Sequence, residues 1–125
     1  MFVPHCSRDM YRGRRGPGEE TGNFTFQGRF IVEAVVKDLM EKEDLRHLKQ
    51  FVLMGRAAGA MGTASNCDDV ADMIREEVNN EVDVRCVMEA GDLFPFWIHD
   101  EGCDPLENIK DSNQLWRGKL VGLSN

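Results

Sequence analysis

The chain has 125 residues, a length that fits one domain or one part of a larger domain. Its 42% of apolar and 30% of charged residues are typical of a globular protein. The formal net charge of −7 argues against a general nucleic-acid binder, because binding of phosphates needs a basic surface. No apolar run approaches the roughly 20 residues of a membrane-spanning helix, and no signal peptide is recognisable at the N-terminus.

The N-terminal part of the chain is expected to be extended and loop-like. Residues 1–6 contain Pro4, which fits a strand end or an edge strand because proline donates no ladder hydrogen bond. Residues 7–22 are punctuated by glycines, and we expect the basic cluster in this loop to be solvated: Arg12, Arg14 and Arg15. Next comes an N-glycosylation sequon, Asn23-Phe24-Thr25, which matters if the protein is secreted.

Apolar periodicity predicts two long helices. The first covers about 26–40, and its expected apolar stripe consists of Phe30, Ile31, Ala34, Val35 and Leu39. Charged residues recur on another face of it, at Arg29, Glu33, Lys37 and Glu41. The second covers about 60–78 and should face a sheet with Cys67, Ala71, Ile74 and Val78. Its water-facing residues should be Asp68, Asp69, Asp72, Arg75 and Glu76.

Two strands flank the second helix. The run Phe51-Val52-Leu53-Met54 indicates a buried parallel strand, and residues 82–88 alternate apolar and polar side chains as a strand does. Strand, helix and strand make a βαβ unit, so the predicted fold class is α/β with a parallel sheet, in a three-stranded fragment. A further helix is predicted to begin at Asp104, with Pro105 at its first position.

The cysteines and acidic residues do not indicate a metal site. None of the four cysteines forms a CxxC pair, and no cluster of Asp, Glu and His has metal-ligand spacing. The sequence therefore predicts neither a metal nor a cofactor. Cys67 and Cys86 fall on expected core faces, where buried thiols are expected.

The segment between the first strand and the second helix is rich in small residues. Its sequence is Met54-Gly55-Arg56-Ala57-Ala58-Gly59-Ala60-Met61-Gly62. One interpretation is a phosphate cradle, although GxxxGxxG differs from the dinucleotide fingerprint GxGxxG. The other is a nucleophile elbow, G-x-S-x-G, a strained strand-to-helix turn with Gly55 and Gly59 as its two glycines. A Cβ atom on either glycine is then expected to collide with the neighbouring backbone, and Arg56 is expected to point away from the core. Ala57 then stands at the nucleophile position, and alanine has no heteroatom with which to form an acyl-enzyme.

Several ordered motifs favour the elbow, because together they resemble the pectin acetylesterase family of α/β hydrolases and its animal Notum branch. Residues 3–9 are similar to the family's PYCSSD segment, and residues 26–35 to its F-x-G…EAV helix. Residues 53–62 align with the elbow L-x-G-x-S-A-G-G-x-G, and residues 66–71 with the helix after it. Residues 89–91 stand where the family has Asp-Ser-Gly or Asp-Ala-Gly, and residues 103–118 resemble a later helix.

The resemblance implies a partial α/β-hydrolase fold, with residues 1–125 as the central portion of a single domain. Family members are secreted carboxylic ester hydrolases, which remove acetyl groups from pectin or a palmitoleoyl group from Wnt proteins. It also implies that the triad Asp and His fall beyond Asn125 and that part of the oxyanion hole falls before Met1. The backbone N–H of Ala58 would remain from that hole. Cys6 and Cys103 are expected to be disulfide halves.

This chain is therefore expected to be an inactive Notum-like homologue or fragment, because Ala57 replaces the nucleophilic serine. Its partners would be an acylated, Wnt-like protein or an acylated polysaccharide. Phe94 and Trp97 lie in a stretch that borders the substrate pocket in the family. One alternative is a non-catalytic decoy that binds an acyl group or a Wnt-like partner. A weaker alternative is a nucleotide-binding βαβ module.

Overall fold

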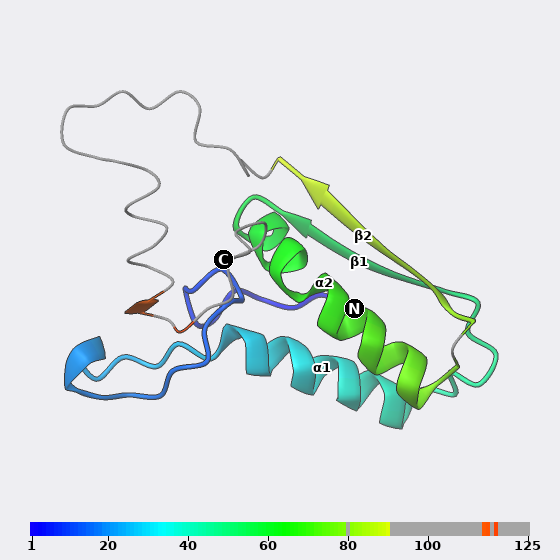
Figure 1. Cartoon of the computed structure of the whole chain (residues 1–125), viewed down its shortest axis with the longest axis horizontal. Helices are drawn as coiled ribbons and strands as arrows, with labels where there is room; N and C mark the ends of the chain where they lie inside the picture. The colour runs from blue at the N-terminus through cyan, green and yellow to red at the C-terminus, as the bar shows by residue number, and fades with distance from the viewer. Residues whose placement is uncertain (80, 91–113, 116, 118–125) are drawn as a thin grey trace.

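A computed structural model of the chain describes residues 1–79, 81–90, 114, 115 and 117. In chain order its elements are a 3-10 helix η1 (Glu19–Thr21), helix α1 (Gly28–Lys42), strand β1 (Gln50–Arg56), helix α2 (Ala58–Glu77) and strand β2 (Asp83–Glu89). Figure 1 shows α2 between α1 and the two strands, so the described part has a layer of sheet and two layers of helix. None of the described helices is long and apolar enough to cross a membrane.

The predicted βαβ unit is confirmed. β1 and β2 pair in parallel, in a register that runs from Gln50 opposite Asp83 to Arg56 opposite Glu89. The described residues form two strands rather than the three expected, because residues 1–6 belong to no strand. Both long helices lie within two residues of the predicted limits.

β1 is not the fully buried strand that its apolar run suggested. Its residues alternate between half-buried and exposed. Phe51 and Leu53 pack against the core beneath α2, whereas Val52 is 51% exposed and Met54 is 60% exposed. The reason is that the described helices cover one face of the sheet, while a parallel sheet is normally covered on both.

The core lies between α1 and α2 and extends to the residue just before β2. It consists of Val32, Val36, Val70, Ile74 and Val82. Of the four residues predicted to face the sheet from the second helix, Ala71 and Ile74 are buried, and Val78 packs against the core one residue after the end of α2. The predicted stripe of α1 is wrong, because the helix packs through the valines and leaves Phe30 44% exposed. α1 is apolar on several faces, so periodicity could not identify the face that packs.

Charged residues also lie between the two helices, contrary to the expectation that Asp69 faces water. Arg29 is 8% exposed. Its guanidinium forms an ion pair with Asp69 of α2, and its Nε lies 3.5 Å from Glu33. A buried guanidinium must be paired to be tolerated. Asp69 provides this pairing across the α1–α2 contact, and Glu33 adds a carboxylate from the next turn of α1 itself.

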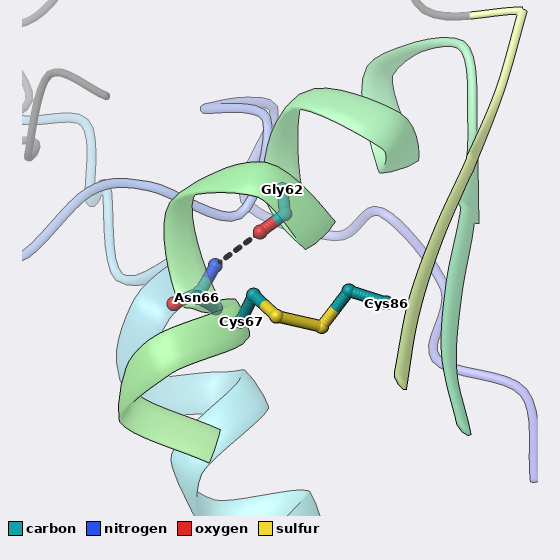
Figure 2. The surroundings of a disulfide bond; sticks show 4 residues. All are labelled: Gly62, Asn66, Cys67 and Cys86. Carbon is teal, nitrogen blue, oxygen red and sulfur yellow. Dashed lines mark hydrogen bonds between the residues drawn. A yellow bond between two sulfur atoms is a disulfide. The ribbon is translucent and has the colours of Figure 1, made fainter. Parts of the chain in front are cut away.

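The expectation of buried thiols at Cys67 and Cys86 is wrong. The two residues form a disulfide that joins α2 to β2, with their Cα atoms 6.1 Å apart (Figure 2). Both lie on the faces where helix and strand oppose each other, which brings them within the distance that a disulfide spans. The sheet and the helix that packs on it are therefore covalently linked.

Candidate functional site

A single residue, Ala57, connects β1 to α2. β1 ends at Arg56 and α2 begins at Ala58. The backbone of Ala57 has φ 52° and ψ −117°, a combination that residues other than glycine rarely adopt. Ala57 therefore lies outside the helix, at the tip of a strained strand-to-helix turn. These are the strained angles expected for a nucleophile elbow.

Some backbone groups of this turn form hydrogen bonds and others do not. The N–H of Ala57 donates to the carbonyl oxygen of Glu89, at the end of β2, with a distance of 3.0 Å. The carbonyl oxygen of Ala57 accepts a hydrogen bond of 2.9 Å from the N–H of Ala60, which closes the first turn of α2. The N–H of Ala58 has no acceptor among the described residues. It is a donor at a positive helix end, available to an oxygen outside the chain.

Close packing across the turn depends on Gly55. A Cβ atom at this position would collide with the carbonyl group of Gly59 and with the hydroxyl of Thr63. A Cβ atom on Gly59 itself would meet no atom within 4 Å. The expectation that both glycines are sterically required is therefore correct for Gly55 and wrong for Gly59, whose missing side chain would enter open space.

The side chains at the turn carry charge but no nucleophile. Arg56 is exposed, as expected, and so is the methyl group of Ala57. In the described part of the chain, no cluster of three or more His, Cys, Asp or Glu residues could hold a metal. The arrangement provides a strained elbow without a nucleophile at its tip, and the N–H groups of Ala58 and Gly59 have no acceptor among the described residues.

The buried carboxylate of Asp9 organises the N-terminal segment, a role that the sequence reasoning missed. Asp9 is fully buried. Its Oδ1 accepts hydrogen bonds from the hydroxyl of Ser7 (2.5 Å) and the N–H of Tyr11 (3.1 Å). Its Oδ2 accepts from the N–H groups of Gly13 (3.2 Å) and Gly28 (2.7 Å). Gly13 and Gly28 were the sequence features that could have indicated this network, because a Cβ atom on either one would collide with the Asp9 carboxylate.

The expectation of a solvated arginine cluster is correct for Arg14, whose side chain is 42% exposed, and wrong for Arg12 and Arg15. Arg12 is 4% exposed, and burial lowers the pKa of its guanidinium, an effect that the nearby Asp9 opposes. Arg14 forms an ion pair of 2.9 Å with Glu33 of α1. The side chain of Arg15 is 15% exposed. Arg12 and Arg15 are shielded from solvent, whereas Arg14 lies on the surface, where the loop passes the start of α1 and its guanidinium reaches Glu33.

The N-terminal segment is attached to the helix that follows the elbow. Nδ2 of Asn66 donates to the carbonyl oxygens of Tyr11 (2.8 Å) and Gly62 (2.7 Å), and Figure 2 shows the second bond. A Cβ atom on Gly62 would lie 2.8 Å from the Tyr11 side chain. Burial raises the pKa of Tyr11, with smaller contributions from Cys6 and Asp9. These contacts hold the first turns of α2 in place behind Ala57.

The remaining predicted positions divide into two groups. Asn23 is exposed in the loop after η1, and Cys6 is an exposed free cysteine. The others lie outside the described residues, namely Phe94, Trp97, Cys103 and the helix start at Asp104-Pro105.

The family model described as Pectinacetylesterase matches residues 1–113. The chain belongs to the pectinacetylesterase family. It is 30% identical to palmitoleoyl-protein carboxylesterase notum1a of Danio rerio, over 94% of this chain and 25% of that protein. It is 28% identical to palmitoleoyl-protein carboxylesterase NOTUM of Mus musculus, over 96% of this chain and 25% of that protein. Pectin acetylesterase 4 of Arabidopsis thaliana matches at 28% identity over 73% of this chain and 21% of its own length.

A solved structure gives the same family assignment. The Wnt deacylase Notum from Drosophila superposes with a TM-score of 0.75 at 26% identity, over 94% of this chain and 33% of that chain. The expected α/β-hydrolase fold is thereby confirmed for this chain. The chain spans about a quarter of the length of the curated relatives that it matches.

Proposed function

We propose that this chain is a Notum-like member of the pectinacetylesterase family that forms no acyl-enzyme at its elbow. One observation carries the proposal: Ala57 alone connects β1 to α2, with φ 52° and ψ −117°. In a serine hydrolase this position presents the nucleophile at the tip of a sharp turn. A methyl group there has no lone pair with which to attack an ester carbonyl, so the covalent pathway is closed.

Neither described histidine is placed to act as a general base for a nucleophile at the elbow. Nε2 of His5 accepts a hydrogen bond of 2.9 Å from the N–H of Met10. His47 is exposed and precedes β1, at the strand end opposite to the turn. A serine at position 57 would therefore find no base in either side chain, and serine is a weak nucleophile without one.

Binding of an acyl ester without hydrolysis is the second candidate function. The free N–H of Ala58, at the N-terminus of α2, favours it. Such a donor can bind the carbonyl oxygen of an ester even where no nucleophile attacks the carbon. The partner would be an acylated protein, as the names of the palmitoleoyl-protein carboxylesterases indicate for those relatives, or an acylated polysaccharide such as the pectin named for the plant relative.

A nucleotide-binding function is not supported by the geometry of the turn. A phosphate cradle needs a loop whose N–H groups converge on one point. A single residue separates β1 from α2, and the N–H of that residue already donates to Glu89. We therefore do not retain the nucleotide-binding alternative.

The proposed location is extracellular. The disulfide between Cys67 and Cys86 supports it, because such bonds persist in oxidising compartments and are rare where thiols are kept reduced.

Hydrolysis of p-nitrophenyl acetate and p-nitrophenyl octanoate tests the first candidate. The purified chain and the variant Ala57→Ser should both release p-nitrophenol no faster than an equal mass of an unrelated protein. A full-length Notum relative serves as the positive control. A burst of p-nitrophenol stoichiometric with the unmodified chain would overturn the proposal, because it would show that an acyl-enzyme forms.

Fluorescence anisotropy with two labelled peptides tests the second candidate. The peptides share one sequence and differ in whether a serine hydroxyl carries an octanoyl ester. A binding protein of the proposed kind should bind the acylated peptide at least tenfold more tightly. Equal affinity for the two peptides would eliminate acyl recognition and leave the first candidate unaffected.

A further inference from the structure

The sequon Asn23-Phe24-Thr25 lies in a fully exposed part of the described chain. Residues 22–25 are all exposed. Phe24 itself is 70% exposed, although an aromatic side chain of this size is normally at least half buried. The asparagine and the threonine of the motif are both accessible, as a transferase that binds the sequon requires.

The loop that carries the sequon is held at both of its ends. On one side, the N–H of Asn23 donates to the carbonyl oxygen of Gly18 at 2.8 Å, over η1. On the other side, Phe26 and Arg15 exchange backbone hydrogen bonds of 2.8 and 2.6 Å. Asn23 has φ 63°, a left-handed conformation that asparagine tolerates better than most residues. Its side-chain amide makes no hydrogen bond to another described residue.

We propose that Asn23 carries an N-linked oligosaccharide. The proposal rests on the extracellular location argued above, since the donor is a lipid-linked oligosaccharide diphosphate of the secretory pathway. The amide nitrogen of Asn23 forms a bond to the anomeric carbon of the sugar, and the bond from that carbon to the diphosphate oxygen breaks. The amide proton passes to a base of the transferase, and the lipid diphosphate leaves with the electron pair.

The position of the site predicts what the oligosaccharide does. It would cover the apolar ring of Phe24, which has 70% of its surface in water. In Figure 1, η1 and the loop after it lie apart from the turn that joins β1 to α2. The sugar should therefore shield an exposed aromatic residue and leave the elbow at Ala57 accessible.

The sequence offers a clean test, because it contains a single N-x-S/T motif. The full chain is expressed behind a cleavable secretion signal in mammalian cells, and lysate and medium are treated with peptide N-glycosidase. After this treatment the chain should migrate faster on a denaturing gel, by one step that corresponds to the loss of one oligosaccharide. Thr25→Ser should keep the step, whereas Asn23→Gln and Thr25→Ala should lack it. Both fractions are analysed, so a chain retained inside the cell also gives a result.

Unchanged mobility of the chain in both fractions, or a step that persists in Thr25→Ala, would overturn the assignment of Asn23. Ester hydrolysis measured on the same material separates this result from the proposed function. A missing oligosaccharide without hydrolysis rejects the glycosylation site alone. Hydrolysis by a glycosylated chain rejects the proposed function alone.

Discussion

The carbonyl group of Gly59 occupies the space that a side chain on Gly55 would need. The strand and the helix approach each other this closely because Ala57 reverses the chain within one residue. The turn thus depends on two local features, a missing Cβ atom at position 55 and a strained backbone at position 57. Each can be tested by a single substitution.

Gly55→Ala should destabilise the chain, and Gly59→Ala should not. The first variant forces a methyl group against the Gly59 carbonyl and the Thr63 hydroxyl, and overpacking of this kind costs about 1–3 kcal/mol. The second variant adds a methyl group that meets nothing within 4 Å, at a position inside α2, where alanine is favoured over glycine by about 0.4–1 kcal/mol. Urea unfolding gives both free energies. Equal losses in the two variants would contradict the described packing.

Removal of the disulfide should lower the free energy of unfolding substantially. The two cysteines are 19 residues apart, and closing a loop of about this length in the unfolded chain contributes about 3 kcal/mol. The double variant Cys67→Ala/Cys86→Ala should therefore unfold at a lower urea concentration than the oxidised chain. Cys6→Ala is the control, because Cys6 is free and exposed. A reductant should affect the unmodified chain and leave the double variant unchanged.

Asp9→Asn should be among the most damaging conservative substitutions. The carboxylate accepts four hydrogen bonds at a fully buried position. An asparagine can accept with one atom, and its NH2 group would face donors, so we expect a loss of about 3 kcal/mol. Asp44→Asn is the matched control, because Asp44 is exposed and pairs with Arg46. The control should leave the free energy of unfolding nearly unchanged, because an exposed ion pair contributes little to stability.

One face of the sheet is covered by none of the described elements, and this should make the 125-residue chain prone to self-association. Val52 and Met54 are exposed on this face, and exposed apolar faces and unpaired strand edges promote aggregation. Met54→Lys should bind less of the dye ANS than the unmodified chain and remain soluble at higher concentration. Leu53→Lys, on the opposite face, should lower the free energy of unfolding by at least about 2 kcal/mol. A sharp melt of a clean monomer without ANS binding would contradict this account.

The sequence was sufficient to predict the order of elements and the parallel βαβ unit, since both depend on local periodicity and on a glycine-rich turn. It was not sufficient to predict which residues are buried or paired, because contacts between separate elements determine this. In α1, apolar residues occur on several faces, and only the contact with α2 selects Val32 and Val36 as the buried ones. Likewise, nothing near Arg29 in the sequence indicates that Asp69, 40 residues later, pairs with it.

The same distinction holds at the candidate site. The spacing of Gly55, Ala57 and Gly59 was enough to predict a strained turn, because its geometry is set within five residues. The network of Asp9 was missed, because its four donors come from Ser7, Tyr11, Gly13 and Gly28 and meet only in the folded chain. The disulfide was missed for a similar reason, since two inward-facing cysteines fit buried thiols equally well until their separation is known.

The stability of Ala57→Gly tests the central claim, that residue 57 is the tip of a strained elbow. Glycine adopts positive φ without the steric cost that alanine meets at φ 52°, a strain of about 1–3 kcal/mol. The variant should therefore raise the free energy of unfolding by about 1 kcal/mol. Ala64→Gly, inside α2, should lower it by about 1 kcal/mol, as glycine does in a helix interior. Equal losses in both variants would place residue 57 in an ordinary helical conformation and contradict the elbow.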